Sequence, residues 1–265
     1  MVNVCFQHEH NEEIDIFWQA LITNQNFNTI AQMIYQLTKE LVFPSPFEAD
    51  ETGLLAIGGD LNVDRLLLAY SQGIFPWFNP EDPTMWWSPA WRPIFIPGEM
   101  KVSKSLKKTI RRNIFEIRMD TAFEQVMRTC GDLRKDEEGT WISEEMIDSY
   151  TILHEMGYAH SVEAWQNNQL VGGLYGVALG KAFFGESMFH KVNDASKVAF
   201  FALSEKLKDW GFKFIDSQVS NPHLESLGSM EIHRTVFMDM LTQAVKMDAL
   251  VGKWKYDIAD LASRF

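Results

Sequence analysis

Hydrophobic side chains recur at intervals of three and four residues in several stretches of the chain, which is the spacing of a helix with one buried face. The first such stretch runs from Asn28, a capping residue type, to Leu41, and Pro44 ends it. Further helices are expected over residues 63–72, 101–112, 143–156, 193–210 and 235–246, with Ser103 and Ser143 as N-caps.

The periodicity changes from helical to strand-like after residue 158. Strands are predicted over residues 159–165, 170–179 and 181–189, joined by short turns, and a fourth over residues 212–219. The helix 193–210 connects the third strand to the fourth. Antiparallel hairpins followed by a crossover of this kind predict an α/β fold with a mixed, mostly antiparallel sheet.

Aromatic residues and prolines alternate between Phe75 and Pro93. Six aromatic residues lie between Phe75 and Trp91, and five prolines interleave with or closely follow them. Because proline removes a backbone donor and fixes φ, this region is predicted to be a rigid loop without regular structure. We place a domain boundary next to it, giving a helical extension (1–43), a small N-terminal domain (44–92) and a larger domain (93–265).

The charge balance argues against a general nucleic-acid binder. The chain has 24 Lys and Arg against 36 Asp and Glu, a net charge of −12. Its two cysteines, Cys5 and Cys130, have no metal-ligand spacing and fit a reducing cytosol. The most apolar stretch, residues 170–180, has 11 residues, whereas a membrane span needs about 20. A cytoplasmic protein without a membrane segment is therefore expected.

One segment departs from this acidic balance. Residues 101–112 contain six basic residues and no acidic one, so the other 253 residues carry a net charge of −18. Lys104, Lys107, Lys108 and Arg111 share one face of the predicted helix. Such a run is usually a solvated surface, but like charges four residues apart destabilise a helix slightly unless an anion meets them. The segment is therefore a candidate for contact with RNA phosphates.

Polar residues interrupt two of the predicted strands. Asp216 and Gln218 fall on one face of the strand 212–219, and Glu186 lies among apolar neighbours on the strand before the crossover helix. Two carboxylates on strands joined by one crossover converge where the strands separate. The alternative is that both carboxylates cap nearby backbone amides.

Other kinds of chemistry find little support. The stretch Gly172–Gly176 resembles a phosphate-binding loop, but no Lys-Ser or Lys-Thr follows it, and a closely packed glycine-rich strand explains it better. We find no Gly-x-Ser-x-Gly elbow, and the seven histidines have no zinc-ligand spacing. Covalent and metal catalysis are therefore both disfavoured.

Seven short motifs resemble one known family in the same order along the chain. From about Pro44 to Leu241, the sequence is similar to bacterial leucyl/phenylalanyl-tRNA–protein transferases. The matching motifs are Gly53–Leu61, Gly73–Phe78, Trp86–Pro89, Glu138–Ile142, His160–Glu163, Gly185–Phe189 and Ile215–Val219.

The resemblance implies a small N-terminal domain and a GNAT-type acyltransferase domain. It implies transfer of Leu or Phe, with Met as a third candidate, from aminoacyl-tRNA to the N-terminal Arg or Lys of a protein, which marks that protein for N-end rule degradation. The implied reaction centre is Glu186, Asp216 and Gln218. The implied substrate-binding residues are Trp77 and Trp141 for the terminal adenosine and aminoacyl group, Leu174, Met188 and Phe200 for the donor side chain, and Asn221. Leu174 and Phe200 depart from the family pattern of Met and Leu, which leaves the donor preference open.

The implied reaction requires no cofactor and no metal, because an aminoacyl ester is already activated. Asp216, oriented by Gln218, would accept or relay a proton from the attacking amine, and Glu186 would bind the cationic acceptor or orient the amine. The sequence leaves open which carboxylate has which role, and the ribose hydroxyl of the tRNA is another candidate for the proton relay. Two alternatives are a CoA-dependent acyltransferase of the same fold and a non-catalytic RNA-binding module. Residues 190–195, His-Lys-Val-Asn-Asp-Ala, lack the Gly-rich loop that the first needs. A monomer is expected.

Overall fold

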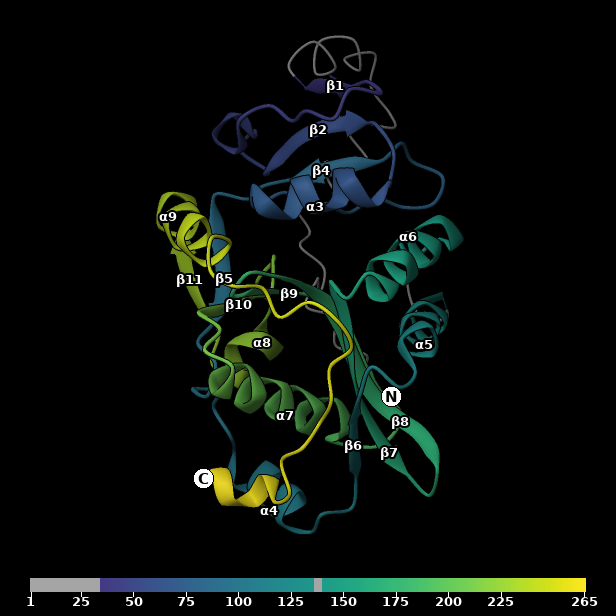
Figure 1. Ribbon diagram of the computed structural model, residues 1–265, viewed down its shortest axis with the longest axis vertical. Helices are drawn as coiled ribbons and strands as arrows, with labels where there is room; N and C mark the ends of the chain where they lie inside the picture. Colours follow the sequence, from purple (N-terminus) through teal and green to yellow (C-terminus); the bar gives the residue numbers. More distant parts are fainter. Residues whose placement is uncertain (1–33, 136–139) are drawn as a thin grey trace.

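The computed structural model describes residues 34–135 and 140–265, and within them the strands form two sheets (Figure 1). The smaller sheet has the order β1-β2-β4-β3 and lies at the top of Figure 1, with helix α3 (Val63–Ser71) on the side that faces the rest of the molecule. Its strands are β1 (Tyr35–Leu37), β2 (Leu54–Gly58), β3 (Phe75–Pro76) and β4 (Met85–Trp87).

The larger sheet has the order β11-β5-β10-β9-β8-β7-β6. Strands β6 to β9 pair antiparallel in succession, and β10 pairs parallel with β9 after the crossover helix α7 (Ala195–Asp209). This order is compatible with the GNAT-type domain that the resemblance implies. The strands are β5 (Trp91–Phe95), β6 (Glu116–Met119), β7 (Ala159–Gln166), β8 (Gln169–Leu179), β9 (Ala182–His190), β10 (Phe214–Asp216) and β11 (Met230–His233).

Helices cover both faces of the larger sheet. Successive side chains of a strand point to opposite sides, so both faces carry apolar side chains that the helices bury. Leu174 of β8 packs in one buried cluster with residues of α7, and the next residue, Tyr175, packs in another with residues of α5 and α6. The remaining helices are α4 (Lys104–Arg111), α5 (Phe123–Lys135), α6 (Glu144–Glu155), α8 (Pro222–Leu227) and α9 (Arg234–Ala244).

The mixed α/β class and several predicted elements are confirmed. Helices α3, α4, α6, α7 and α9 and strands β7, β8 and β9 lie within a few residues of their predicted positions. Both predicted N-caps form: the side-chain oxygens of Ser103 and Ser143 accept the backbone N–H groups of Leu106 and Met146, each at 3.2 Å. The domain boundaries proposed from the sequence stay a prediction; the boundary at residues 92–93 falls within β5.

Three expectations about secondary structure are wrong, and four elements were missed. The helix predicted up to Leu41 is a strand at Tyr35–Leu37, paired parallel with β2, and the rest of that helix lies largely outside the described residues. The aromatic region 75–93 forms β3, β4 and the start of β5, because these short strands pair with each other or with strands from elsewhere in the chain. Strand β10 ends at Asp216 and not at residue 219. Elements α8, β6 and β11 were not predicted because they are short, whereas α5 was overlooked although Phe123, Val126, Met127 and Cys130 have the spacing of one buried helix face.

Candidate functional site

The side chain of Glu186 lies at the junction of the two sheets and is 2% exposed. Its Oε1 accepts hydrogen bonds from the Tyr70 hydroxyl and from Nε2 of Gln218, each at 2.7 Å. Its Oε2 accepts a longer one, 3.4 Å, from the Tyr150 hydroxyl. The two tyrosine hydroxyls are also within hydrogen-bond distance of each other, so with Glu186 ionised their two protons are shared among these three contacts. Three donors thus surround one buried carboxyl group.

A β-bulge on β9 directs Glu186 toward these donors. On β8, Tyr175 pairs with Ser187 and Gly176 pairs with Gly185, so Glu186 has no partner residue opposite it. An extra residue of this kind bends the strand and redirects its side chain. A Cβ at Gly176 would lie 2.1 Å from the carbonyl oxygen of Phe184, so the bulge requires glycine there.

The donors come from three separate elements. Tyr70 lies in α3 beside the smaller sheet, Tyr150 lies in α6, and Gln218 follows β10. Both tyrosines were missed by the sequence analysis, because each sits at a buried helix position that looks like ordinary core. The one available signal is that a buried tyrosine hydroxyl needs a hydrogen-bond partner.

Burial dominates the electrostatics of this centre. Loss of hydration raises the pKa of Glu186 to about 7. The donors Tyr70, Gln218 and Tyr150 counteract this rise, while the negative charge of Asp216 adds to it. Burial also raises the pKa of both tyrosines well above 10, so their hydroxyls stay protonated at neutral pH.

Asp216 is fully buried and is held by an arginine that the sequence analysis did not identify. Its Oδ1 and Oδ2 lie 3.1 and 2.6 Å from Nε and Nη2 of Arg92. Oδ1 also accepts the backbone N–H of Gln218 at 2.9 Å. Gln218 has a left-handed φ of +66° and lies in a turn after β10, from which its side chain reaches Glu186. The prediction that Gln218 lies on the face of a strand is therefore wrong.

The two predicted adenosine-binding tryptophans lie close together. The ring centroids of Trp77 and Trp141 are 6.5 Å apart and the rings are perpendicular. The indole N–H of Trp87 donates to the carbonyl of Trp77 at 2.6 Å and holds that loop.

The three predicted pocket residues also come together, within the cluster on the α7 side of the sheet. Leu174 and Met188 are cross-strand partners, and Phe200 of α7 packs edge-on against Phe95 at 4.8 Å. All three side chains are buried, each with at most 1% of its surface exposed. Asn221 is the N-cap of α8, where its side-chain oxygen accepts the backbone N–H of Leu224 at 2.9 Å.

Comparison with known proteins gives the family. The model of the leucyl/phenylalanyl-tRNA protein transferase matches residues 94–242, and that of its N-terminal domain matches residues 59–90. The chain belongs to this family. The leucyl/phenylalanyl-tRNA–protein transferase of Thermodesulfovibrio yellowstonii is 52% identical, and the match covers 84% of this chain and 91% of that protein. That of Legionella pneumophila is 52% identical, with 81% and 96% covered.

Membership of the leucyl/phenylalanyl-tRNA–protein transferase family confirms the resemblance and the predicted enzyme class, an aminoacyltransferase. It favours this class over the CoA-dependent and non-catalytic alternatives. A solved aminoglycoside acetyltransferase from a soil metagenomic sample is 13% identical, with 54% of this chain and 96% of that chain covered and a TM-score of 0.34. The fold assignment therefore rests on the strand order.

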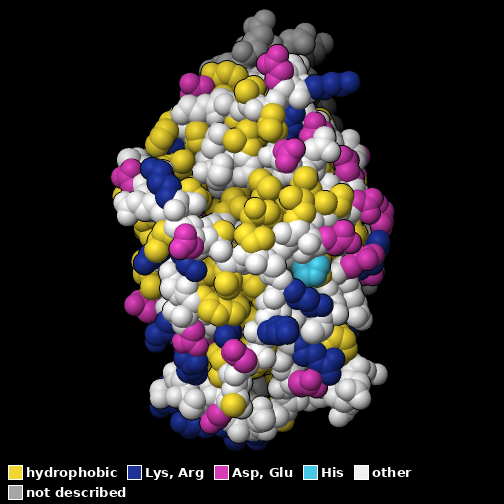
Figure 2. Space-filling view, viewed as in Figure 1, with side chains coloured by type: hydrophobic (Ala, Val, Ile, Leu, Met, Phe, Trp, Pro, Cys, Tyr) yellow, Lys and Arg dark blue, Asp and Glu magenta, His cyan; other side chains and the backbone are white. Residues whose placement is uncertain are grey.

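The predicted cationic face is present on α4. Lys104, Lys108 and Arg111 are exposed and Lys107 is half-buried, while Leu106 and Ile110 face the core. The Phe265 ring lies 5.0 Å from Nζ of Lys107 and 5.7 Å from the Arg111 guanidinium carbon. Helix α4 lies at the end of the molecule opposite the smaller sheet (Figure 1). Figure 2 shows many Lys and Arg side chains in that lower half and a band of hydrophobic side chains across the middle.

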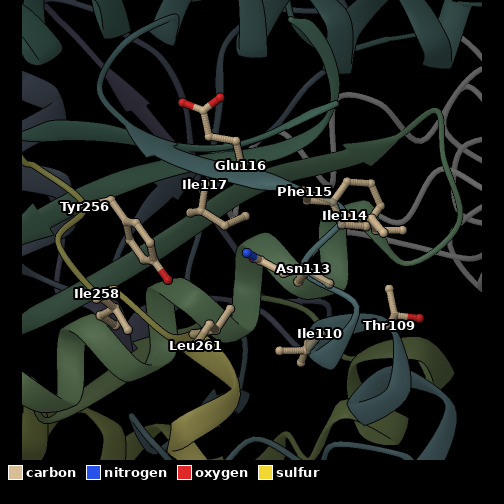
Figure 3. A pocket seen from close by; sticks show the side chains of 12 residues that line it. Thr109, Ile110, Asn113, Ile114, Phe115, Glu116, Ile117, Tyr256, Ile258 and Leu261 are labelled. Carbon is tan, nitrogen blue, oxygen red and sulfur yellow. The ribbon is translucent and has the colours of Figure 1, made fainter. Parts of the chain in front are cut away.

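A cavity of about 290 Å³ lies between α4, β6, α7 and the C-terminal segment. None of the predicted site residues lines it. The Tyr256 hydroxyl and the Asn113 amide point into it, whereas the Glu116 carboxylate points away (Figure 3). Among the described residues there is no group of three or more potential metal ligands, and no helix there is long and apolar enough to cross a membrane.

The burial of Glu186 predicts a pH dependence of stability. Because its pKa rises from 4.5 to about 7 on folding, the folded state binds the proton more tightly. The free energy of unfolding should therefore fall as the pH rises through this range, by on the order of 3 kcal/mol from this group. Glu186→Gln should remove that contribution, as measured by urea denaturation at pH 5 and pH 8.

Glu116→Gln provides the matched control, because Glu116 is exposed and its pKa is lowered by its hydrogen bonds to Arg118. This variant should keep the wild-type difference between the two pH values. An unchanged difference in Glu186→Gln would contradict the assignment.

Proposed function

We propose that this chain transfers Leu or Phe, with Met as a third candidate donor, from an aminoacyl-tRNA to the α-amino group of a protein that begins with Arg or Lys. The observation that carries this proposal is the buried Glu186 carboxyl group, surrounded by hydrogen-bond donors, in a chain of this family. The product would be a target of N-end rule degradation. We further propose that the enzyme acts in the cytoplasm as a monomer.

Glu186 accepts the proton of the attacking amine. The amine nitrogen attacks the ester carbonyl carbon, the bond from that carbon to the ribose oxygen breaks, and the nitrogen gives a proton to Glu186. The proton then passes to the departing ribose oxygen, so the carboxylate is regenerated. A base with a pKa of about 7 suits this task, because an α-amino group has a pKa of about 7.7–8.0. The protein adds orientation by holding ester and amine together.

Asp216 and Gln218 position the centre in this proposal. Both oxygens of Asp216 are engaged by Arg92, and Oδ1 also accepts the Gln218 N–H, so Asp216 holds the turn in place. Trp77 and Trp141 stack on the terminal adenosine of the tRNA. Asn221 fixes the turn that follows Gln218 by capping α8.

Kinetics of transfer test the roles of the two carboxylates. With Phe-tRNA and an Arg-starting peptide, the wild-type rate should rise with pH through about 7 as Glu186 ionises. Glu186→Gln should lower the single-turnover rate by about 10²- to 10⁴-fold and abolish this rise, with tRNA affinity retained. Asp216→Asn should transfer Phe more slowly than the wild type, and its rate should still rise with pH.

Loss of the pH dependence in Asp216→Asn but not in Glu186→Gln would instead make Asp216 the proton acceptor and Glu186 the positioning residue. Glu163→Gln is the control, because Glu163 is a fully buried carboxylate held by Thr121 and Ser161. It should keep the wild-type pH dependence. Absence of transfer by the wild type with every charged tRNA would exclude the proposed function.

Salt dependence tests the cationic face of α4. Replacing Lys104, Lys107, Lys108 and Arg111 by alanine should weaken binding to all tRNAs alike. Removal of each phosphate contact should lower the slope of log K against log salt by about 0.7–0.9. Alanine at Lys213, Lys253 and Lys255, which are exposed elsewhere, should leave the slope unchanged. An unchanged slope in the α4 variant would make this face an ordinary solvated surface.

Donor choice tests the pocket formed by Leu174, Met188 and Phe200. Phe200→Leu should enlarge the pocket and shift competition between Leu-tRNA and Phe-tRNA toward Phe by about 10-fold, since small differences in an apolar pocket give graded discrimination. Phe201→Leu is the control, because the Phe201 ring stacks on Phe265 instead. Equal shifts in both variants would place the specificity elsewhere.

A further inference from the structure

Arg92 lies at the junction of the two sheets, and its guanidinium donates to groups on both sides. Arg92 belongs to β5 and is 1% exposed. Its Nε and Nη2 contact Asp216 at the end of β10, and its Nη1 donates to the carbonyl of Gly73 at 2.7 Å. Gly73 lies in the turn that ends α3, with a left-handed φ of +70°. One side chain therefore joins α3 to the reaction centre.

These contacts complete a closed set of links around Glu186. Gly73 is three residues from Tyr70, which donates to Oε1 of Glu186. Asp216 accepts the backbone N–H of Gln218, whose side chain donates to the same oxygen. The two donors that share Oε1 are thus each connected to Arg92, one through the Gly73 turn and the other through Asp216.

The surroundings of Arg92 fix the plane of its guanidinium. Its central carbon lies 5.0 Å from the ring centroid of Phe75 and 4.3 Å from that of Phe237. Three donors in one rigid plane can meet a carboxylate and a carbonyl at once, which a lysine ammonium on a flexible stem does less well.

We propose that Arg92 is a positioning residue of the transfer reaction: by holding Asp216 and the Gly73 carbonyl together, it sets the hydrogen bonds that Tyr70 and Gln218 give to Glu186. This proposal rests on the transfer function proposed above. The alternative is that Arg92 only neutralises a buried charge, in which case its loss would affect folding alone.

The two possibilities differ in the pH dependence of the rate. The charged or titratable groups around Glu186 are Tyr70 of α3, Tyr150 of α6, and Asp216 of β10 with its partner Arg92. Hydrogen bonds to a carboxylate lower its pKa, so a displaced Gln218 shifts the rise of the rate to higher pH. Partial unfolding instead lowers the rate without moving the rise to higher pH, and most strongly at high pH, where the protein is least stable.

The experiment is a double-mutant cycle of Arg92→Lys and Gln218→Ala. Single-turnover transfer of Phe from saturating Phe-tRNA to saturating peptide is followed between pH 5.5 and 9. Arg92→Lys alone should lower the rate by about 10- to 100-fold and move its rise to higher pH, with tRNA affinity unchanged. In the Gln218→Ala background it should lower the rate by a clearly smaller factor, because the Gln218 hydrogen bond is already absent and only the effect through Tyr70 remains.

Arg234→Lys is the matched control. Arg234 is also a buried arginine, and its Nη1 donates to the carbonyls of Pro46 and Ser88 in the N-terminal part of the chain. It should leave the pH dependence unchanged. Equal effects of Arg92→Lys in both backgrounds, or a lower rate whose rise does not move to higher pH, would overturn the proposal.

A second variant tests the same proposal in the event that Arg92→Lys does not fold. Asp216→Asn removes the acceptor and leaves the arginine, and the same cycle with Gln218→Ala should again be non-additive. An additive result would overturn the proposal. The wild-type assay separates the two ideas: no transfer by the wild type rejects the function, whereas transfer with additive variants rejects only the role of Arg92.

Discussion

Removal of the Glu186 carboxyl group from water is the constraint on which the arrangement of the two sheets depends. A buried carboxyl group is tolerated only where donors satisfy its oxygens. Here the donors come from α3, α6 and the turn after β10, so none of these elements can move away without leaving a polar group unpaired. The hydrogen bonds that build the site therefore also dock the smaller sheet, through α3, on the larger one.

The bulge at Glu186 explains how one strand serves both faces of the sheet. Phe184 lies before the bulge and packs in the cluster that holds Tyr175. Met188 lies after the bulge and packs in the cluster on the α7 side, although it is four positions from Phe184. A regular strand would place both on the same side. The extra residue reverses the alternation, so that Met188 joins Leu174 and Phe200 on the α7 side.

Local patterns predicted the parts of the fold that local forces determine. The capped helices and the hairpin strands 159–190 follow from periodicity and capping, which need only neighbouring residues. The short strands around Trp86 and Met230 were missed because pairing with distant segments stabilises them. Glu186, Asp216 and Gln218 were found as polar interruptions of apolar strands. Tyr70, Tyr150 and Arg92 were not, because nothing in their local sequence distinguishes a core residue from a partner of a buried carboxylate.

The charge distribution suits a protein that meets RNA at a limited surface. Outside residues 101–112 the net charge is −18, which repels a polyanion from most of the surface. The exposed cations of α4 lie at one end of the molecule, and α3 lies toward the other (Figure 1), where its Tyr70 donates to Glu186. An RNA held by phosphate contacts at α4 gains affinity there but no chemistry. In the reaction proposed above, the 3′ end reaches Glu186 without electrostatic help, and stacking on Trp77 and Trp141, which is insensitive to charge, is the interaction we propose to hold it.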